Sequence, residues 1–331
     1  MKLSIGIVGL PNVGKSTLFR LLTKQAVNVA NYPFATIDPN VGIVPVPDER
    51  LLKLTELSKS KKTIPAVVEF YDIAGLVRGA SKGEGLGNQF LSHIKEVNAI
   101  VHLLRCFPGS DIVHIENRVD PIADLEIIHA ELSLKDLEAV EKAIGRAESD
   151  ARGGKKEALT ALPVLARAKE ALEQGRQIVE YANDPAVQPL NLLMAKKQLY
   201  LLNGSAADVP EALAARIKAL GGEHIIADLA HTDAVPELIR AAYRILDLIS
   251  FFTTGEDETR AWTTVRGALA PKAAGEIHSD FEEKFIRAEV IEWEKLVEAG
   301  GWSAAKAKGW LRIEGKDYAV KDGDVMVIRH G

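Results

Sequence analysis

The sequence predicts an α/β fold built on a doubly wound, mostly parallel sheet, with an inserted α-helical hairpin and a small α+β domain after it. Three observations lead to this fold class. Apolar strand patterns alternate with helical ones over the first 120 residues, apolar residues then recur at helical spacing over 121–182, and short strands separated by turns follow residue 250. The expected units are 1–120 and 186–248 for the two parts of the first domain, 121–185 for the insertion and 249–331 for the last domain.

The composition is that of an ordinary globular protein, with 47% hydrophobic and 26% charged residues. The formal net charge is −5, so contact with nucleic acid or a ribosome must use local basic patches rather than the summed field. Cys106 is the only cysteine, which excludes an intrachain disulfide and favours a reducing compartment. No secretory signal precedes the first strand pattern and no apolar run reaches the ~18 residues of a membrane span. We therefore expect a cytoplasmic protein without a membrane partner.

A phosphate-binding loop follows the first buried strand, at residues 3–8. Residues 9–17 read Gly-Leu-Pro-Asn-Val-Gly-Lys-Ser-Thr and fit the pattern G-x-x-x-x-G-K-[ST], and a helical pattern begins at Ser16. Backbone N–H groups of such a loop point at phosphate oxygens, and the positive end of the helix adds to the attraction. A glycine-rich turn with a chance lysine is disfavoured because strand, loop and helix come in the required order. The predicted phosphate-binding residues are Asn12, Val13, Gly14, Lys15, Ser16 and Thr17.

Each side chain of this loop has an expected task. Lys15 would reach the β- and γ-phosphates as part of the catalytic machinery, and Ser16 would offer its hydroxyl to Mg²⁺. Thr17 would help to hold the α/β-phosphate region. In the proline-punctuated loop 31–40, Thr36 is placed to give Mg²⁺ a second hydroxyl and to sense the γ-phosphate, with a plain connecting loop as the alternative.

A second chemical motif follows the strand at 66–71. An aspartate at the carboxyl end of a strand beside a phosphate loop can hold a water bound to Mg²⁺, which is the role we expect for Asp72. The N–H of Gly75 can meet the γ-phosphate. Leu76 stands where many GTPases carry the glutamine that orients the attacking water, and leucine cannot hydrogen-bond water. His114, in the loop after the strand at 99–105, can polarise water, although an isolated loop histidine is the reading that the residues alone favour.

The helical insertion and the C-terminal unit contain no candidate catalytic residues. Gly153 and Gly154 interrupt the helical pattern of 121–182, which predicts an antiparallel hairpin that serves either as a stabilising arm or as a partner-binding arm. The C-terminal unit has no catalytic constellation; it is either a recognition module or a domain whose tryptophans only pack. Its predicted strands are 262–265, 285–290, 318–320 and 325–328.

Several segments together resemble the YchF-type Obg-like ATPases: residues 9–16, 31–34, 72–77, 83–88 and 285–290. The resemblance spans nearly the whole chain. It implies a P-loop GTPase-type fold of the translation-factor class, with a helical insertion and a C-terminal TGS domain of β-grasp type. It also implies Mg²⁺-dependent hydrolysis of ATP in preference to GTP and association with the ribosome, with the large subunit as the expected contact.

The resemblance also bears on individual residues. The family lacks the usual glutamine, which matches Leu76, and its catalytic histidine falls on His114, which becomes the favoured catalytic residue beside Lys15 and Gly75. The base-specifying Asn-x-x-Glu motif of the family falls on residues 203–206, where Ala206 replaces the glutamate. Asn203 can still hydrogen-bond the adenine edge and Gly204 can offer backbone contacts.

The expected ligand is therefore ATP, with GTP possible because Ala206 leaves the base motif incomplete. Asn12 raises the further hypothesis of a K⁺ ion near the β- and γ-phosphates. The first functional hypothesis is an ATP-hydrolysing switch whose loops at Thr36 and Gly75 change on hydrolysis. The alternatives are a nucleotide-gated ribosome- or RNA-binding module with incidental turnover, and a GTPase/ATPase that does not select between purines.

Overall fold

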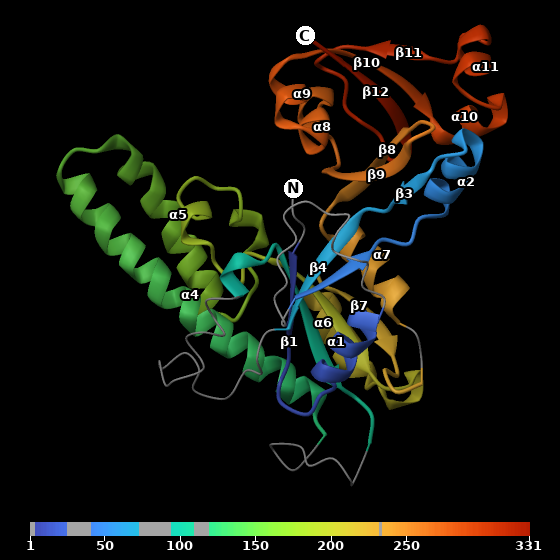
Figure 1. Ribbon diagram of the computed structural model, residues 1–331. Coiled ribbons are helices and arrows are strands. Elements are labelled where there is room, and N and C mark those ends of the chain that lie inside the picture. The colour runs from blue at the N-terminus through green and yellow to red at the C-terminus, as the bar shows by residue number, and fades with distance from the viewer. Residues whose placement is uncertain (1–3, 25–40, 73–93, 109–118, 232–233) are drawn as a thin grey trace.

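The computed structural model describes residues 4–24, 41–72, 94–108, 119–231 and 234–331. A central α/β domain carries a helical arm on one side and a second, mainly β domain at one end (Figure 1). Within the described residues, no helix is long and apolar enough to cross a membrane.

The first sheet has six strands in the order β2-β4-β1-β5-β6-β7. Among the described strands of this sheet, only β2 and β4 pair in antiparallel fashion; the remaining pairs are parallel. This confirms the predicted doubly wound α/β fold, and β2, with Pro45, lies at an edge where a missing N–H costs little. The strands are β1 (Ser4–Val8), β2 (Val41–Pro45), β4 (Val67–Asp72), β5 (Ala99–Arg105), β6 (Lys197–Asn203) and β7 (Glu223–Ala227). Among its described residues this domain has the helices α1 (Lys15–Lys24), α6 (Glu211–Ala219) and α7 (Val235–Ile245), together with a 3₁₀ turn, η5 (Ala206–Asp208).

The strand register places side by side the strand ends that carry candidate functional residues. Ile7 at the end of β1 lies opposite Asp72 of β4, and Arg105 at the end of β5 lies opposite Asn203 of β6. Asn203 in turn pairs with Ala227 at the end of β7. The loops that leave the carboxyl ends of the parallel strands therefore meet along one edge of the sheet, where open α/β sheets bind ligands.

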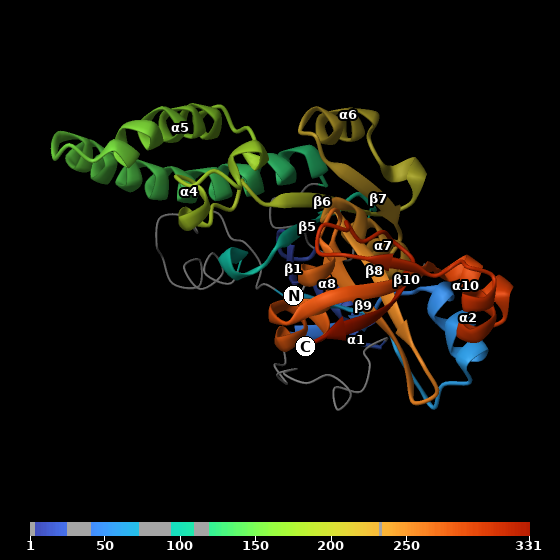
Figure 2. The same ribbon diagram turned by 90° about the horizontal axis from the view of Figure 1, so that it is seen from above.

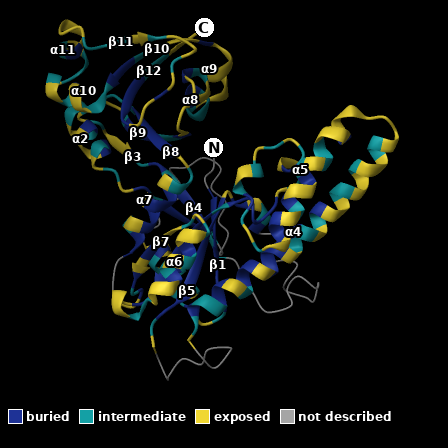
Figure 3. Ribbon diagram, turned by 180° about the vertical axis from the view of Figure 1, so that it is seen from behind, coloured by how far each residue is buried: buried dark blue, intermediate teal, exposed yellow. Residues whose placement is uncertain are grey.

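The predicted helical hairpin is present as α4 (Pro121–Arg152) and α5 (Lys156–Glu173). The side chain of Asp120 caps the start of α4 by accepting from the Ala123 N–H, and a turn through Gly154 (φ 83°) joins the two helices. The hairpin projects away from the sheet, and its far end is mostly exposed whereas the strands of the sheet are buried (Figures 2 and 3). Two short 3₁₀ turns, η3 (Val179–Tyr181) and η4 (Gln188–Leu190), lead back to β6.

The second sheet has the order β11-β10-β12-β8-β9-β3 and confirms the predicted C-terminal α+β domain. The predicted strand at 318–320 is wrong: Tyr318 closes a turn onto Gly315, and Ala319 forms only an isolated bridge with Leu269. The strands are β8 (Leu248–Thr254), β9 (Glu258–Val265), β10 (Phe285–Glu292), β11 (Arg312–Glu314) and β12 (Asp324–His330). The helices are α8 (Ala270–Ile277), α9 (Ser279–Glu283), α10 (Trp293–Ala299) and α11 (Trp302–Ala307).

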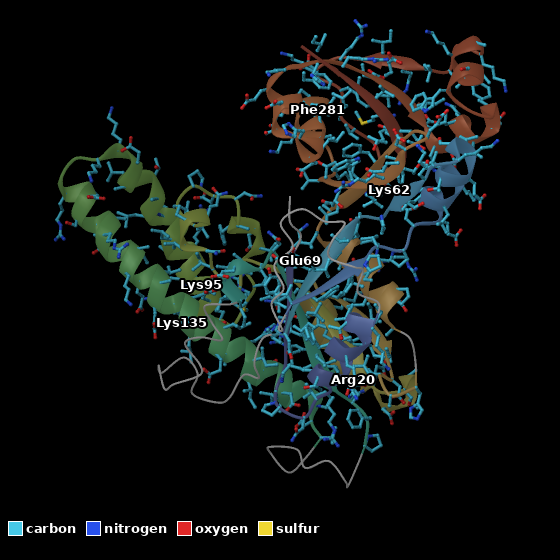
Figure 4. All side chains as sticks on the ribbon, viewed as in Figure 1. Arg20, Lys62, Glu69, Lys95, Lys135 and Phe281 are labelled. Atoms are coloured by element: carbon cyan, nitrogen blue, oxygen red, sulfur yellow. The ribbon has the colours of Figure 1, made fainter. Side chains whose placement is uncertain are left out.

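One segment of the first 120 residues belongs to this second sheet. Between β2 and β4 the chain forms α2 (Glu49–Ser58) and β3 (Lys62–Ile64), and β3 pairs in parallel with β9 as its edge partner. Lys62 on β3 therefore lies against the C-terminal sheet, far from Arg20 on α1 (Figure 4). The sequence did not indicate that a segment of the first 120 residues joins the C-terminal sheet. The domain boundaries at 120, 185 and 248 stay predictions.

Candidate functional site

The loop after β1 adopts a conformation that only small residues permit. Gly14 has φ 108°, and a Cβ there would lie 2.5 Å from Asn203 Nδ2. A Cβ at Gly9 would lie 2.7 Å from the Leu103 carbonyl oxygen, so the loop passes directly against β5. Asn12 also has a positive φ, 64°, which asparagine tolerates better than most residues. The sequence pattern therefore corresponds to a tightly wound loop at the start of α1.

Lys15 lies across this loop. Its Nζ donates to the carbonyl oxygens of Gly9 and Leu10, at 2.9 Å each. Burial lowers the pKa of Lys15 to about 8, because the ammonium loses water, while the charge of Asp72 acts in the opposite direction. A phosphate oxygen at the loop would give this ammonium the anionic partner that carbonyl oxygens only partly replace.

Asp72 and Ser16 offer oxygen atoms beside Lys15. Burial raises the pKa of Asp72, and the charge of Lys15 opposes that rise. The carboxylate and the ammonium therefore interact electrostatically. Ser16 is exposed in the first turn of α1. Hydroxyl and carboxylate oxygens are the hard ligands that Mg²⁺ prefers, so these residues fit the ion. Within the described ranges no group of three or more His, Cys, Asp or Glu side chains could hold a metal.

Asn203 ties the phosphate loop to the neighbouring strand ends. Its side chain is 4% exposed; Nδ2 donates to the Val13 carbonyl at 2.9 Å, and Oδ1 accepts from the Leu229 N–H at 3.1 Å. The second Nδ2 hydrogen has no acceptor among the described residues. Gly204 follows in close contact with the next loop, since a Cβ there would lie 3.0 Å from the Phe107 nitrogen. The predicted contacts of Asn203 and Gly204 with a base stay predictions.

A cavity of about 620 Å³ opens beside the loop and is large enough for a nucleoside. Beyond the phosphate loop it has apolar lining from Phe107, Leu229 and Ala230 and carboxylates from Asp208 and Asp228. The Arg105 guanidinium lies 4.4 Å from the centre of the Phe107 ring and supports it. The residues lining the cavity are Asn12, Gly14, Lys15, Ser16, Thr17, Phe107, Pro108, Asn203, Asp208, Asp228, Leu229, Ala230 and His231.

The sequence reasoning missed Phe107, Asp208 and Asp228 as lining residues. Each lies within a few residues of the end of β5, β6 or β7, so the rule that ligands bind at strand carboxyl ends was the available signal. Of the predicted residues, the structure brings together those of the phosphate loop, Asp72 and Asn203. Thr36, Gly75 and His114 lie outside the described residues, as does Leu76, and their roles stay predictions.

Comparisons with known proteins cover both ends of the chain. Residues 4–142 match a family model described as "50S ribosome-binding GTPase". Residues 248–331 match the model YchF-GTPase_C, described as a protein of unknown function. The chain is 46% identical to the "Ribosome-binding ATPase YchF" of Bacillus subtilis, over 99% of both chains. It belongs to the YchF family.

Other members support the same placement. The YchF of Escherichia coli O157:H7 is 44% identical over 98% of both chains. The solved structure of the Schizosaccharomyces pombe YchF GTPase matches with a TM-score of 0.85 and 37% identity, over 99% of this chain and 98% of that one. The resemblance stated from the motifs is therefore confirmed, and the fold of this chain is the YchF fold from end to end.

Proposed function

We propose that this YchF protein is a Mg²⁺-dependent nucleoside triphosphate hydrolase that prefers ATP to GTP and acts as a ribosome-associated molecular switch. The observation that carries the proposal is the phosphate loop, with Lys15 held across it, at the mouth of a cavity of nucleoside size. Relatives over the full length are named ribosome-binding ATPases, which makes the chain an NTP-hydrolysing enzyme. The description "50S ribosome-binding GTPase" supports a large-subunit contact, and a ribosomal partner supports a cytoplasmic location.

The proposed reaction divides the work among a few groups. Lys15 and the loop N–H groups bind and orient the phosphates, with Ser16 and Thr36 offering hydroxyls to Mg²⁺ and Asp72 holding a water of that ion. When bound, Mg²⁺ neutralises charge on the β- and γ-phosphate oxygens. His114 assists the attack of water, and the Gly75 N–H meets the γ-phosphate. The hypothesis of K⁺ beside Asn12 predicts a slower rate when Na⁺ replaces K⁺.

Choice of base is the part that the family motif leaves open, because Ala206 replaces its glutamate. The test is calorimetric titration of ATP and GTP, with Mg²⁺ and K⁺ present, into the wild type and Ala206→Glu. A preference for ATP of at least tenfold, ~1.4 kcal/mol, supports the ATPase. Equal binding of the two nucleotides by the wild type, with a preference gained in Ala206→Glu, would make the chain a hydrolase that does not select between purines.

The two functional hypotheses, a switch driven by hydrolysis and a binding module with incidental turnover, predict different behaviour for His114→Ala. If hydrolysis drives the switch, the variant should lose turnover and remain on ribosomes in sedimentation assays with ATP. If the chain is a nucleotide-gated binding module, release from ribosomes should be unchanged while turnover falls. The far end of the α4–α5 arm, which is mostly exposed, offers a surface for such binding (Figure 3).

A further inference from the structure

Asp208 is fixed at the edge of the nucleoside-sized cavity by its own turn. The side chain of Ser205 and its backbone N–H both donate to Asp208 Oδ2, at 2.6 and 2.9 Å, and form a capping box around η5. Asp208 lines the cavity together with Asn203, whereas Ala206, two residues earlier, is exposed and is not part of the lining. The turn therefore presents an acidic side chain from a position that the family motif does not use.

The two oxygens of this carboxylate differ in their partners among the described residues. Oδ2 already accepts two hydrogen bonds, and Oδ1 has no hydrogen-bond partner among the described residues. Asp228, the other carboxylate of the cavity, accepts from the Ala230 N–H through Oδ1 and lies 2.8 Å from His231 Nδ1 through Oδ2. Of the two carboxylates in the described lining, Asp208 is thus the one with an acceptor atom that has no hydrogen-bond partner among the described residues.

A single acceptor atom discriminates between purines. Adenine carries one amino group at position 6, whereas guanine carries an oxygen there and presents its two donors side by side at N1 and N2. A carboxylate with both oxygens free suits the guanine pair, whereas a single free oxygen that faces position 6 accepts from the adenine amino group and repels the guanine oxygen. The remaining N–H of Asn203 can meet only an acceptor such as N7, which both purines have.

We propose that Asp208 selects the base, with Oδ1 accepting a hydrogen bond from the 6-amino group of adenine in place of the glutamate that Ala206 replaces. This inference rests on the proposed nucleotide binding and deepens it. It assigns ATP preference to a side chain outside the Asn203–Ala206 tetrapeptide, held ready by Ser205 before any nucleotide arrives.

The test compares ATP with purine riboside triphosphate, which is ATP without the 6-amino group, by calorimetry on the wild type and Asp208→Ala. The wild type should bind ATP about tenfold or more tightly than the analogue, as expected for a hydrogen bond to a charged group. Asp208→Ala should bind the two equally. If the variant keeps the wild-type ratio, the inference is overturned.

Asp208→Asn gives a sharper readout and guards against loss of the turn. Its amide oxygen can still accept from Ser205, so that η5 stays capped, while its N–H₂ replaces the free acceptor by a donor. The ratio of ATP to inosine triphosphate, which carries an oxygen at position 6, should then shift toward inosine triphosphate by about tenfold or more. The matched control is Glu211→Gln, an exposed carboxylate three residues further on that does not line the cavity, which should leave that ratio unchanged. An unchanged ratio in Asp208→Asn would overturn the inference.

Failure of the inference and failure of the proposed function are separable. Tripolyphosphate, titrated into the wild type and Asp208→Ala, reports the phosphate loop alone and should bind both equally. If the wild type binds neither ATP nor tripolyphosphate, the proposed function fails and the inference fails with it. If it binds both and no Asp208 variant changes base preference, only the inference fails.

Discussion

Lys15 titrates within an accessible pH range because the loop buries its ammonium. Its pKa of about 8 means that the side chain is charged below pH 8 and loses its proton above it. A bound triphosphate stabilises the charged form, so binding takes up a proton once the free protein has lost it. We predict that ATP affinity falls above pH 8, approaching tenfold per pH unit. Calorimetry from pH 7 to 9.5, in buffers of different ionisation enthalpy, measures both the affinity and the proton uptake.

The control for this titration is Lys15→Arg, because a guanidinium keeps its charge throughout the range. That variant should bind more weakly than the wild type at pH 7 but with an affinity that stays flat as the pH rises. Wild-type affinity that is equally flat up to pH 9.5 would contradict the assigned role of the Lys15 proton.

Gly14 is a position of the loop at which both the space and the backbone angle exclude a side chain. Gly14→Ala would place a Cβ at φ 108° and 2.5 Å from Asn203 Nδ2, so that the bond from Asn203 to Val13 is also disturbed. Backbone strain of this kind costs about 1–3 kcal/mol. We predict a loss of ATP affinity of about tenfold to a hundredfold, measured by calorimetry. Gly145→Ala, where a Cβ meets nothing within 4 Å in α4, is the control and should leave affinity unchanged.

At the scale of elements, two buried histidines lie where the base of α4 meets the first sheet. His102 of β5 stacks on Tyr200 of β6 with ring centres 5.0 Å apart, and His129 of α4 has Nε2 3.1 Å from the Tyr200 hydroxyl. Neither ring nitrogen of His102 has a hydrogen-bond partner among the described residues, nor does His129 Nδ1. Burial lowers the pKa of His129 to about 4 and that of His102 as well. Both rings are therefore neutral in the folded protein near pH 7.

This cluster predicts loss of stability in acid. The unfolded chain takes up protons on histidine below about pH 6.5, whereas folded His129 does so only near pH 4. Stability is thus fully present above pH 6.5 and falls as the pH drops. His129 alone should cost about 2 kcal/mol between pH 7 and 5. Urea unfolding at the two pH values, on the wild type and His129→Gln, measures the difference; the two proteins having the same pH dependence would contradict this origin.

The elements also show what the sequence could and could not reveal. The phosphate loop was predictable because one contiguous pattern specifies its conformation, and the α4–α5 hairpin was predictable because its periodicity is long and breaks at paired glycines. Asp208 was not, because its role depends on Ser205 turning it toward a cavity whose walls come from three different strand ends. The pairing of β3 with β9 was likewise hidden, since a three-residue strand nearly two hundred positions away from its partner leaves no local signal.

On the scale of the whole molecule, the two sheets share the segment between β2 and β4. Arg50 of α2 binds Asp322 through both of its terminal nitrogens, at 2.9 and 3.2 Å, and lies over the Phe252 ring. Asp322 also accepts from the Ser250 N–H, at 3.0 Å, which joins α2, the turn before β12 and β8 in one network. Farther along the segment, Ser60 donates to the Gly255 carbonyl. The C-terminal sheet is consequently completed by residues that leave and re-enter the nucleotide domain.

Asp322→Ala should destabilise the packing of both α2 and β8. It removes the Arg50 ion pair and leaves the N–H of the buried Ser250 without its acceptor. We predict a cost of about 1–2 kcal/mol, most of it from the unsatisfied N–H, since the ion pair is partly exposed. Hydrogen exchange should rise in α2 as well as in β8. Asp322→Asn, which keeps an acceptor for Ser250, should cost less.

Nucleotide affinity provides the second readout for Asp322→Ala. The phosphate loop and Asp72 lie at the carboxyl ends of β1 and β4, whereas the α2–β3 segment leaves and rejoins the first sheet at the opposite end of β4. ATP binding should therefore stay within about twofold of the wild type while α2 exchanges faster. Faster exchange confined to residues 248–331, with α2 unchanged, would show that the two sheets are stabilised independently and that the shared segment does not couple them.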